Sequence, residues 1–208
     1  MRALTDREAE RALIARCKAG DQEAWREVVR CWGPVLARFL HRLGVPAVEH
    51  DEVAQEVLVL MFESLPGFRE DARLSTWMYR IAANVTWKRR RSQRRRQGVL
   101  DRFAAALGRT VPAPTVDQRD RIEARSELRQ LETILEQLRP KLRVVWVMVE
   151  LEQLSPLDVA NALDLRPGTV RSRLHEARRQ VIGHLTPPSA DVRRKLRVVS
   201  NRKQGGTR

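Results

Sequence analysis

Cysteine is scarce in this sequence: among its 208 residues only Cys17 and Cys31 are cysteine. Two cysteines make no disulfide framework, and there is neither a CxxC motif nor a His/Cys pair at metal-ligand spacing, so we predict no metal site. No apolar run approaches the roughly 18 residues of a membrane-spanning helix, and the charged N-terminus lacks the continuous apolar segment of a signal peptide. The composition therefore indicates a reduced, cytoplasmic protein without stable membrane insertion.

Sequence motifs of the common catalytic sites are also lacking. The chain has no Walker loop, no HExxH and no GxSxG motif. His41 and His50 have no partner at a useful spacing, and helix faces and caps account for the acidic residues. We therefore predict that the protein is not an enzyme and has no cofactor. A hydrolase or nuclease acting on nucleic acid is one alternative, but it would need clustered metal-binding carboxylates, which we do not find.

Positive charge and helix-forming residues are what the chain has in excess. The formal net charge is +14, which indicates a polyanionic partner: nucleic acid first, an anionic membrane surface second. Aromatic residues make up only 5% of the chain, and valine is scattered among leucine, alanine, arginine and glutamate, which favour helices. We predict an all-α fold of two small helical domains joined by a flexible linker.

Hydrophobic periodicity predicts four helices in a first domain of residues 1–97, at 5–18, 21–43, about 49–64 and 73–96. Thr5 and Asp21 are the expected caps of the first two helices. Gly33 and Pro34 are expected to bend or interrupt the second helix. The third helix should turn four side chains inward: Val53, Val57, Leu60 and Met61.

The fourth helix combines a buried face with a cationic end. Its apolar positions recur at helical spacing: Leu74, Trp77, Met78, Ile81, Ala82 and Val85. From Lys88 to Arg96, seven of nine residues are lysine or arginine. This pattern predicts a helix that is anchored on one side and contacts a polyanion on the other.

The remainder divides into a linker, a second domain and a tail. Residues 98–119 contain glycines and prolines and read as a linker, with one short helical piece at 100–107. Residues 120–185 form the second domain, with helices at 121–138 and from Pro140 onward. Residues 186–208 carry seven basic residues against one acid and are expected to be a disordered basic tail.

Residues 155–185 have the pattern of a helix-turn-helix. Ser155 and Asp158 form a capping box, and a second helix opens at Pro167. One face of this second helix is apolar and the other bears basic and hydroxyl groups, which can bond base edges or phosphates. The polar face carries Arg171, Ser172, Arg173, His175, Arg178 and Arg179. An amphipathic hairpin with a solvated basic face is the alternative interpretation.

Four stretches together resemble the extracytoplasmic-function group of bacterial sigma factors, the promoter-recognition subunits of RNA polymerase. They are EAWREVVRCWGPVLARFLHRL, DEVAQEVLVLMFESLPGF, RLSTWMYRIAANVTWKRRR and LSPLDVANALDLRPGTVRSRLHEARRQV. The resemblance implies that residues 1–97 are a sigma region 2 domain and residues 120–185 a region 4 domain. It further implies an alternative sigma factor that binds core polymerase, at the largest-subunit clamp and the flap, and directs promoter-specific transcription initiation.

The resemblance also assigns site residues. The stretch that docks on the polymerase clamp contains Asp51, Glu52, Gln55 and Glu56. Contacts to the minus-ten element, including a flipped base that an aromatic ring can stack on, fall on Phe68, Asn84, Trp87, Lys88, Arg89, Arg90 and Arg91. Contacts to the minus-thirty-five element fall on Thr169, Arg171, Ser172, Arg173, His175 and Arg178. Phe68 has an equally simple alternative role as a core residue.

Two departures from the family pattern bear on these expectations. Ala83 stands where the family often has a basic or larger residue, and Gln153 where it commonly has glycine. Proteins of the family are commonly held inactive by an anti-sigma factor, and this chain is expected to be a monomer when free. A free-standing helix-turn-helix regulator that binds DNA without polymerase is the alternative function, but it leaves residues 21–96 unexplained.

Overall fold

The computed structural model describes residues 6–70, 72–106 and 126–184. Every regular element in these ranges is a helix, and no strand is present there, so the predicted all-α fold is confirmed. The predictions for Thr5, for residues 107–119 of the linker and for the tail at 186–208 lie outside the described residues. No helix in the described part of the chain is both long and apolar enough to cross a membrane.

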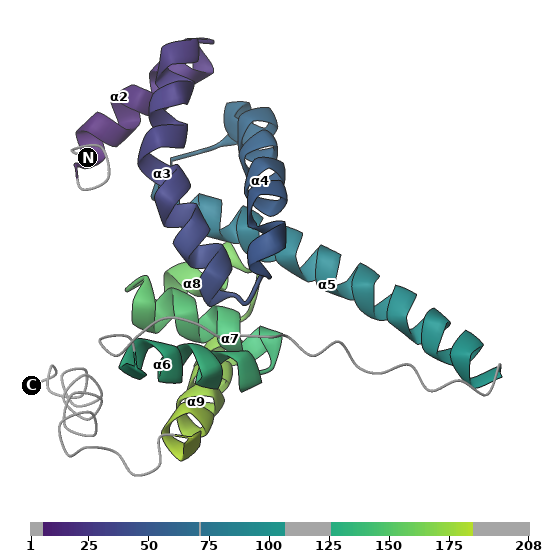
Figure 1. The fold of residues 1–208 in the computed structure, drawn as a ribbon. Coiled ribbons are helices and arrows are strands. Elements are labelled where there is room, and N and C mark those ends of the chain that lie inside the picture. Colours follow the sequence, from purple (N-terminus) through teal and green to yellow (C-terminus); the bar gives the residue numbers. More distant parts are fainter. Residues whose placement is uncertain (1–5, 71, 107–125, 185–208) are drawn as a thin grey trace, which may run out of the picture.

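The helices form two groups that lie against each other (Figure 1). The first helical group comprises α2 (Arg7–Lys18), α3 (Gln22–Arg42), η1 (Ala47–Glu49), α4 (His50–Ser64), η2 (Leu65–Gly67) and α5 (Leu74–Ala106). The second helical group comprises α6 (Ser126–Gln137), α7 (Pro140–Trp146), η3 (Val147–Leu151), α8 (Pro156–Ala162) and α9 (Pro167–His184). The C-terminal end of α5 extends away from both groups (Figure 1).

Side-chain caps fix where several helices begin. The Asp21 carboxylate accepts hydrogen bonds from the backbone N–H groups of Glu23 and Ala24, at 2.9 and 3.2 Å. The Ser155 hydroxyl oxygen accepts one from the N–H of Asp158 at 3.1 Å. Both predicted caps are therefore confirmed, because each side chain satisfies an N–H that has no partner within its helix. Helix α2 is capped by Asp6.

Helix α3 continues without interruption through Pro34, so of the two predicted effects, a bend or an interruption, the interruption is wrong. Proline inside a helix costs about 3 kcal/mol, since it removes one hydrogen bond and crowds the preceding turn. Trp32 and Leu36, on either side of it, are completely buried. Burial of large apolar side chains contributes about 1.5–3 kcal/mol each, which offsets the cost of the proline.

The inward stripe of α4 is narrower than expected. Val53, Val57 and Met61 are buried, as predicted, but Leu60 is 37% exposed and does not belong to the stripe. Around the helix axis, residues 53, 57 and 61 follow one another in steps of about 40°, and residue 60 lies about 60° from 57 and about 100° from 61, so Leu60 stands at the edge of the stripe. The first helical group is therefore held by fewer α4 side chains than the periodicity indicated.

Helix α5 is longer than predicted and has a distant cap. It runs from Leu74 to Ala106 as one helix of 33 residues and passes through Gly98, where the sequence indicated the start of a linker. The buried carboxylate of Glu10, on α2, accepts hydrogen bonds from the backbone N–H of Leu74 at 3.0 Å and from Arg73 at 3.2 Å. A side chain of the first helix thus caps the helix that carries the basic run.

The second helical group contains the predicted helix-turn-helix, formed by α8 and α9. Val170, Leu174, Ala177 and Val181 are buried, which confirms the apolar face of α9. The lead into this motif is a π-helical turn, η3, followed by Gln153 at φ 56°. The left-handed conformation accounts for the glycine that the family commonly has at this position.

The two cysteines differ in environment, which predicts different reactivity. Cys17 is 5% exposed, and burial raises its pKa to about 11, so almost no reactive thiolate forms near neutral pH. Cys31 is only half-buried. We expect a thiol reagent at pH 7.5 to modify one cysteine per folded chain, at Cys31, and two in urea; peptide mapping would identify the site. Equal labelling rates in the folded protein would contradict the buried position of Cys17.

Candidate nucleic-acid interface

Helix α9 presents a polar face to solvent. Arg171, Ser172 and His175 are exposed, and Thr169 and Arg173 are partly exposed. The Ser172 hydroxyl donates a hydrogen bond to the Thr169 carbonyl at 3.0 Å, which leaves the lone pairs of the oxygen available to a ligand. Five of the six residues predicted for the minus-thirty-five contact therefore lie on an accessible surface.

Arg178, the sixth, is engaged within the fold. Its Nε and Nη2 atoms both donate to the same oxygen of Glu150, at 2.8 and 2.6 Å. The Glu150 side chain is only 13% exposed, so this pair ties α9 to η3 in a partly buried setting. The next residue, Arg179, pairs with Glu176 one turn earlier and lowers the pKa of that carboxyl by hydrogen bonding. Sequence periodicity alone could not separate these engaged arginines from the free ones.

The basic residues of α5 also divide into exposed ones and ones that are paired within the fold. Lys88 and Arg91 are exposed. Arg89 instead donates to Glu56 at 2.7 Å and to Glu52 at 2.9 Å, across to α4. These hydrogen bonds raise the pKa of Arg89 and lower that of Glu52. A residue predicted to bind DNA and two predicted to bind the polymerase therefore form one ion-pair cluster, the Arg89 cluster.

Arg90 binds the carbonyl groups at the C-terminal end of α3. Its Nη2 atom donates to the carbonyl oxygens of Leu43 and Gly44, both at 2.8 Å. Burial, and next the charge of Arg94, lower the pKa of Arg90. A guanidinium at this position satisfies carbonyls that have no partner at a helix C-terminus. Arg90 thus has a structural role that its place in a basic run concealed.

The aromatic side chain of the loop before α5, that of Phe68, is buried. Phe68 is 6% exposed, and its ring centroid lies 4.8 Å from that of Trp77. Phe68 therefore takes the core position in this conformation and is not available to stack on a base. Asn84 is exposed and Trp87 is half-buried, so both have accessible atoms on the polar side of α5.

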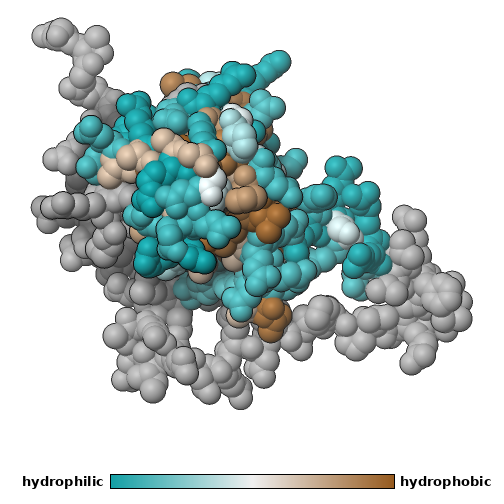
Figure 2. Space-filling view, turned by 90° about the horizontal axis from the view of Figure 1, so that it is seen from above, coloured by the Kyte–Doolittle hydropathy of each residue, from teal (hydrophilic) through white to brown (hydrophobic). Residues whose placement is uncertain are grey.

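The side of α4 that faces away from the core carries two kinds of residue. Asp51 and Gln55 are exposed in its first half, while Val59 and Phe62 in its second half are 55% and 59% exposed. Together with Glu52 and Glu56 these residues form what we call the outer face of α4. Figure 2, which looks down on this end of the molecule, shows hydrophobic atoms gathered among hydrophilic ones. Sequence reasoning missed Val59 and Phe62, although both lie outside the inward stripe.

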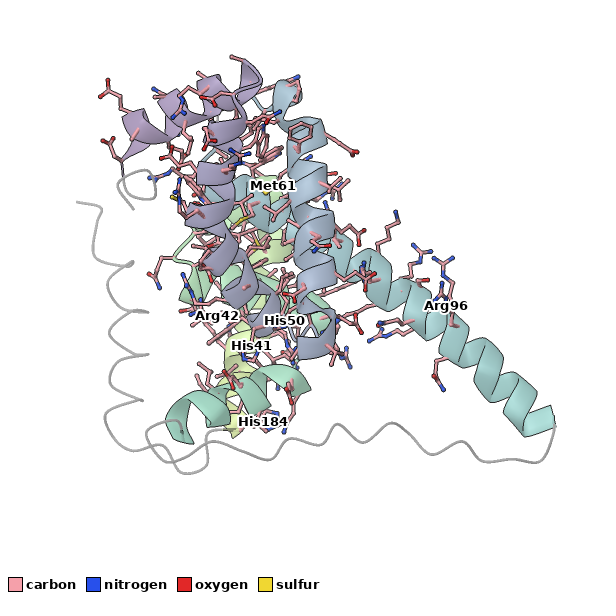
Figure 3. All side chains as sticks on the ribbon, turned by 45° about the horizontal axis from the view of Figure 1, so that its top comes forward. His41, Arg42, His50, Met61, Arg96 and His184 are labelled. Carbon is pink, nitrogen blue, oxygen red and sulfur yellow. The ribbon has the colours of Figure 1, made fainter. Side chains whose placement is uncertain are left out.

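The contact between the two helical groups is centred on Glu152, which follows η3. Its carboxylate accepts hydrogen bonds from Arg42 at 2.6 Å and from the Tyr79 hydroxyl. The Glu152 side chain is 11% exposed and Tyr79 is 4% exposed. Burial, and then the hydrogen bond to Glu152, raise the pKa of Tyr79, so its hydroxyl stays a donor. Figure 3 shows Arg42 and His41 at the end of α3 that meets the second group.

A second buried contact lies beside the first. Arg143, on α7, is 3% exposed and donates to the Leu43 carbonyl at 3.0 Å and to the Leu135 carbonyl. Burial lowers the pKa of Arg143 to about 10. The guanidinium packs against Gly44, whose φ of +73° is of the kind that favours glycine. The buried apolar residues of both groups belong to one contiguous core.

A helix-turn-helix with an accessible basic face, and a second basic helix beside it, define a DNA-binding protein of two helical units. The Sigma-70 region 2 model matches residues 28–96 and the Sigma-70 region 4 model matches residues 128–181, together more than half of the chain. The chain belongs to the sigma-70 family of RNA polymerase sigma factors, in its extracytoplasmic-function (ECF) group, as the resemblance predicted.

Individual relatives agree with this assignment. The ECF RNA polymerase sigma-E factor of Escherichia coli (strain K12) is 29% identical over 202 residues, which cover 88% of this chain and 98% of the relative. The ECF RNA polymerase sigma factor SigW of Bacillus subtilis (strain 168) is 26% identical, over 79% of this chain and 90% of its own. The solved structure of CnrH in complex with the cytosolic domain of CnrY matches with a TM-score of 0.61 and 26% identity, over 86% of this chain and 98% of that one.

Proposed function

We propose that this chain is an alternative sigma factor that binds core RNA polymerase and directs promoter-specific transcription initiation. The observation that carries the proposal is the presence of both promoter-recognition regions in family order, the second of them on a helix-turn-helix with a free basic face. Sigma factors of this family are initiation factors, and the polymerase supplies the chemistry. The protein would therefore act in the bacterial cytoplasm, where the polymerase works.

The outer face of α4 is the proposed contact with the clamp of the polymerase's largest subunit. Asp51 and Gln55 can bond a basic partner helix, while Val59 and Phe62 provide apolar area that would become buried on binding. Exposed apolar side chains beside charged ones are typical of protein interaction sites. The second helical group would contact the flap.

Two further surfaces are proposed for promoter DNA. Asn84, Lys88 and Arg91 on α5 would engage the minus-ten element, with Trp87 stacking at its edge. On α9, Arg171, Ser172 and Arg173 would read the minus-thirty-five element in the major groove, with Thr169 and His175 beside them. Arg89, Arg90 and Arg178 would contribute only after leaving their present partners. An anti-sigma factor is the proposed protein partner that controls the free form; the relative CnrH was solved in complex with a partner's cytosolic domain.

Run-off transcription with bacterial core polymerase and a randomised promoter library tests the proposal. Transcripts that depend on this protein and share two short elements about two helical turns apart would support it. If no such transcripts form and the protein does not co-elute with core polymerase, the proposal fails and a free-standing helix-turn-helix regulator becomes the better account.

Substitutions on the two DNA surfaces should have different signatures. The double variant Lys88→Ala/Arg91→Ala should weaken use of all promoters and reduce the salt slope by about 0.7–0.9 per lost phosphate contact. Arg173→Ala should change the preference at one minus-thirty-five position, by about 1–3 kcal/mol for a bidentate base contact. Competition among promoter libraries would measure both. A uniform loss across all promoters for Arg173→Ala would contradict base reading by that residue.

A further inference from the structure

A cleft of about 990 Å³ lies between the basic half of α5 and the second helical group. Its polar lining consists mainly of cations from both groups: Arg90, Arg91, Arg94 and Arg95 on α5, with Arg139, Lys141 and Arg173 on the opposite side. Glu176 is the one acid in this lining. We call it the interdomain cleft. Cavities of this size are within the usual range for small-molecule sites.

The charges of the interdomain cleft are not neutralised by the protein. Across the described ranges, no carboxylate forms an ion pair with Arg91, Arg94, Arg95, Arg139, Lys141 or Arg173. Glu176 is itself held by Arg179, which lies outside the lining. Several like charges converging on one partly enclosed space repel one another, and a bound anion would remove that repulsion.

Neighbouring cations along the cleft also lower one another's pKa. Besides burial, the charge of Arg94 lowers the pKa of Arg90, and the charge of Arg90 lowers that of Arg143 behind it. Arg90 and Arg143 are held in place by carbonyl oxygens, which do not cancel a full charge. Glu49 and Glu136 oppose these shifts only as lesser causes, so the fold keeps a row of guanidinium groups close together with a net excess of positive charge.

We propose that the interdomain cleft binds a polyphosphate anion. Guanidinium groups match phosphate oxygens in pairs, so several arginines suit several linked phosphates. Duplex DNA would reach Arg91 and Arg173 only at the mouth of the cleft and would not fill it, because its major groove alone is about 12 Å wide. The remaining wall is apolar and includes Trp87, Pro140 and Leu142, which could hold a base. A nucleoside polyphosphate and an inorganic polyphosphate both supply the linked phosphates that these arginines would bind.

The bound anion would link the two helical groups, since its ligands come from α5 on one side and from α7 and α9 on the other. It would also occupy Arg91 and Arg173, which the proposed function assigns to promoter DNA. Polyphosphate and promoter DNA should therefore compete for this protein. The binding proposal itself does not rest on the sigma-factor function; only the competition does.

Calorimetric titration of the full chain with inorganic tripolyphosphate, and separately with ATP, both without Mg²⁺, tests the proposal. We expect one anion per chain. The variant Arg139→Gln/Lys141→Gln, at exposed lining positions, should weaken binding at least tenfold, and Arg94→Gln/Arg95→Gln should do the same from the other side. Tighter binding of ATP than of tripolyphosphate would assign the apolar wall to a base; equal affinity would point to the phosphate chain alone.

The matched control is Arg7→Gln/Arg30→Gln, which removes the same charge at exposed positions of α2 and α3 away from the cleft. It should bind tripolyphosphate like the unmodified chain. Several anions per chain, or equal weakening in the control and the cleft variants, would overturn the proposal in favour of diffuse attraction to a basic protein. Thermal unfolding of each variant without ligand would verify that it is folded.

Discussion

Replacing Glu152 with alanine should weaken the contact between the two helical groups. The substitution removes the acceptor that the Arg42 guanidinium and the Tyr79 hydroxyl share; Tyr79 is buried and would be left unpaired, whereas Arg42 is 33% exposed and can be hydrated. Hydrogen bonds to a charged group contribute about 1.5–3 kcal/mol, so we expect a loss of about 2–3 kcal/mol in the free energy of unfolding. Urea unfolding would measure this loss.

The matched control is Glu132→Ala, which also removes a contact between the two groups. Glu132 pairs with His41 at 3.0 Å, but both side chains are about half exposed. Exposed pairs contribute little, so the control should change stability by less than about 1 kcal/mol.

The pH dependence of the Glu152→Ala effect follows from the pKa of Tyr79. Because this pKa is raised in the folded state, the contribution of Tyr79 to stability is fully present at every pH below its pKa in the unfolded chain, about 10. The Glu152→Ala effect should accordingly be the same at pH 7 and pH 9; equal effects of the two variants would refute a central role of Glu152.

Replacing Gly44 with alanine should disturb the same contact through the backbone. A Cβ at this position would overlap the buried Arg143 guanidinium and lie 3.1 Å from Arg90. The positive φ adds strain of about 1–2 kcal/mol for any side chain. Arg143 could move only by giving up its hydrogen bonds to carbonyl oxygens. We expect a total loss of about 2–4 kcal/mol, measured by urea unfolding.

Gly98 provides the control for this experiment. It lies within α5, and nothing stands within 4 Å of the Cβ that alanine would add. Alanine is favoured over glycine inside a helix by about 0.5–1 kcal/mol, so Gly98→Ala should stabilise the protein. Opposite signs for the two substitutions are therefore expected. Stabilisation by Gly44→Ala would show that Arg143 is not held as the structure indicates.

The local features of this fold could be predicted from the sequence because short-range chemistry determines them. Asp21 and Ser155 cap helices within three residues of their own position, and the apolar face of α9 follows from spacing alone. Predictions failed where distant packing decides. Helix α3 continues through Pro34, where the flanking Trp32 and Leu36 are completely buried, and Leu60 stays 37% exposed although its position is close to that of the buried Val53 around the helix axis.

The candidate site was harder to predict than the fold. A run of arginines looks uniform in sequence, yet Arg89, Arg90 and Arg178 each have a partner in the fold. Those partners lie 33, 47 and 28 residues away, so no local pattern identifies them. The buried acid that joins the two helical groups is separated from Arg42 by 110 residues. Tertiary structure decides which charges remain unpaired, because each of these pairs forms only where two helices that are distant in sequence come into contact.

The Arg89 cluster has a thermodynamic consequence for the proposed function. Glu52 and Glu56 belong to the face proposed to contact the polymerase, and Arg89, on the helix proposed to contact DNA, donates hydrogen bonds to both. A polymerase side chain that takes these carboxylates would free Arg89 for a phosphate. By linkage, a phosphate that takes Arg89 would free the carboxylates by the same factor. Each partner would then raise the affinity for the other, so a free sigma factor would hold DNA more weakly than the assembled holoenzyme does.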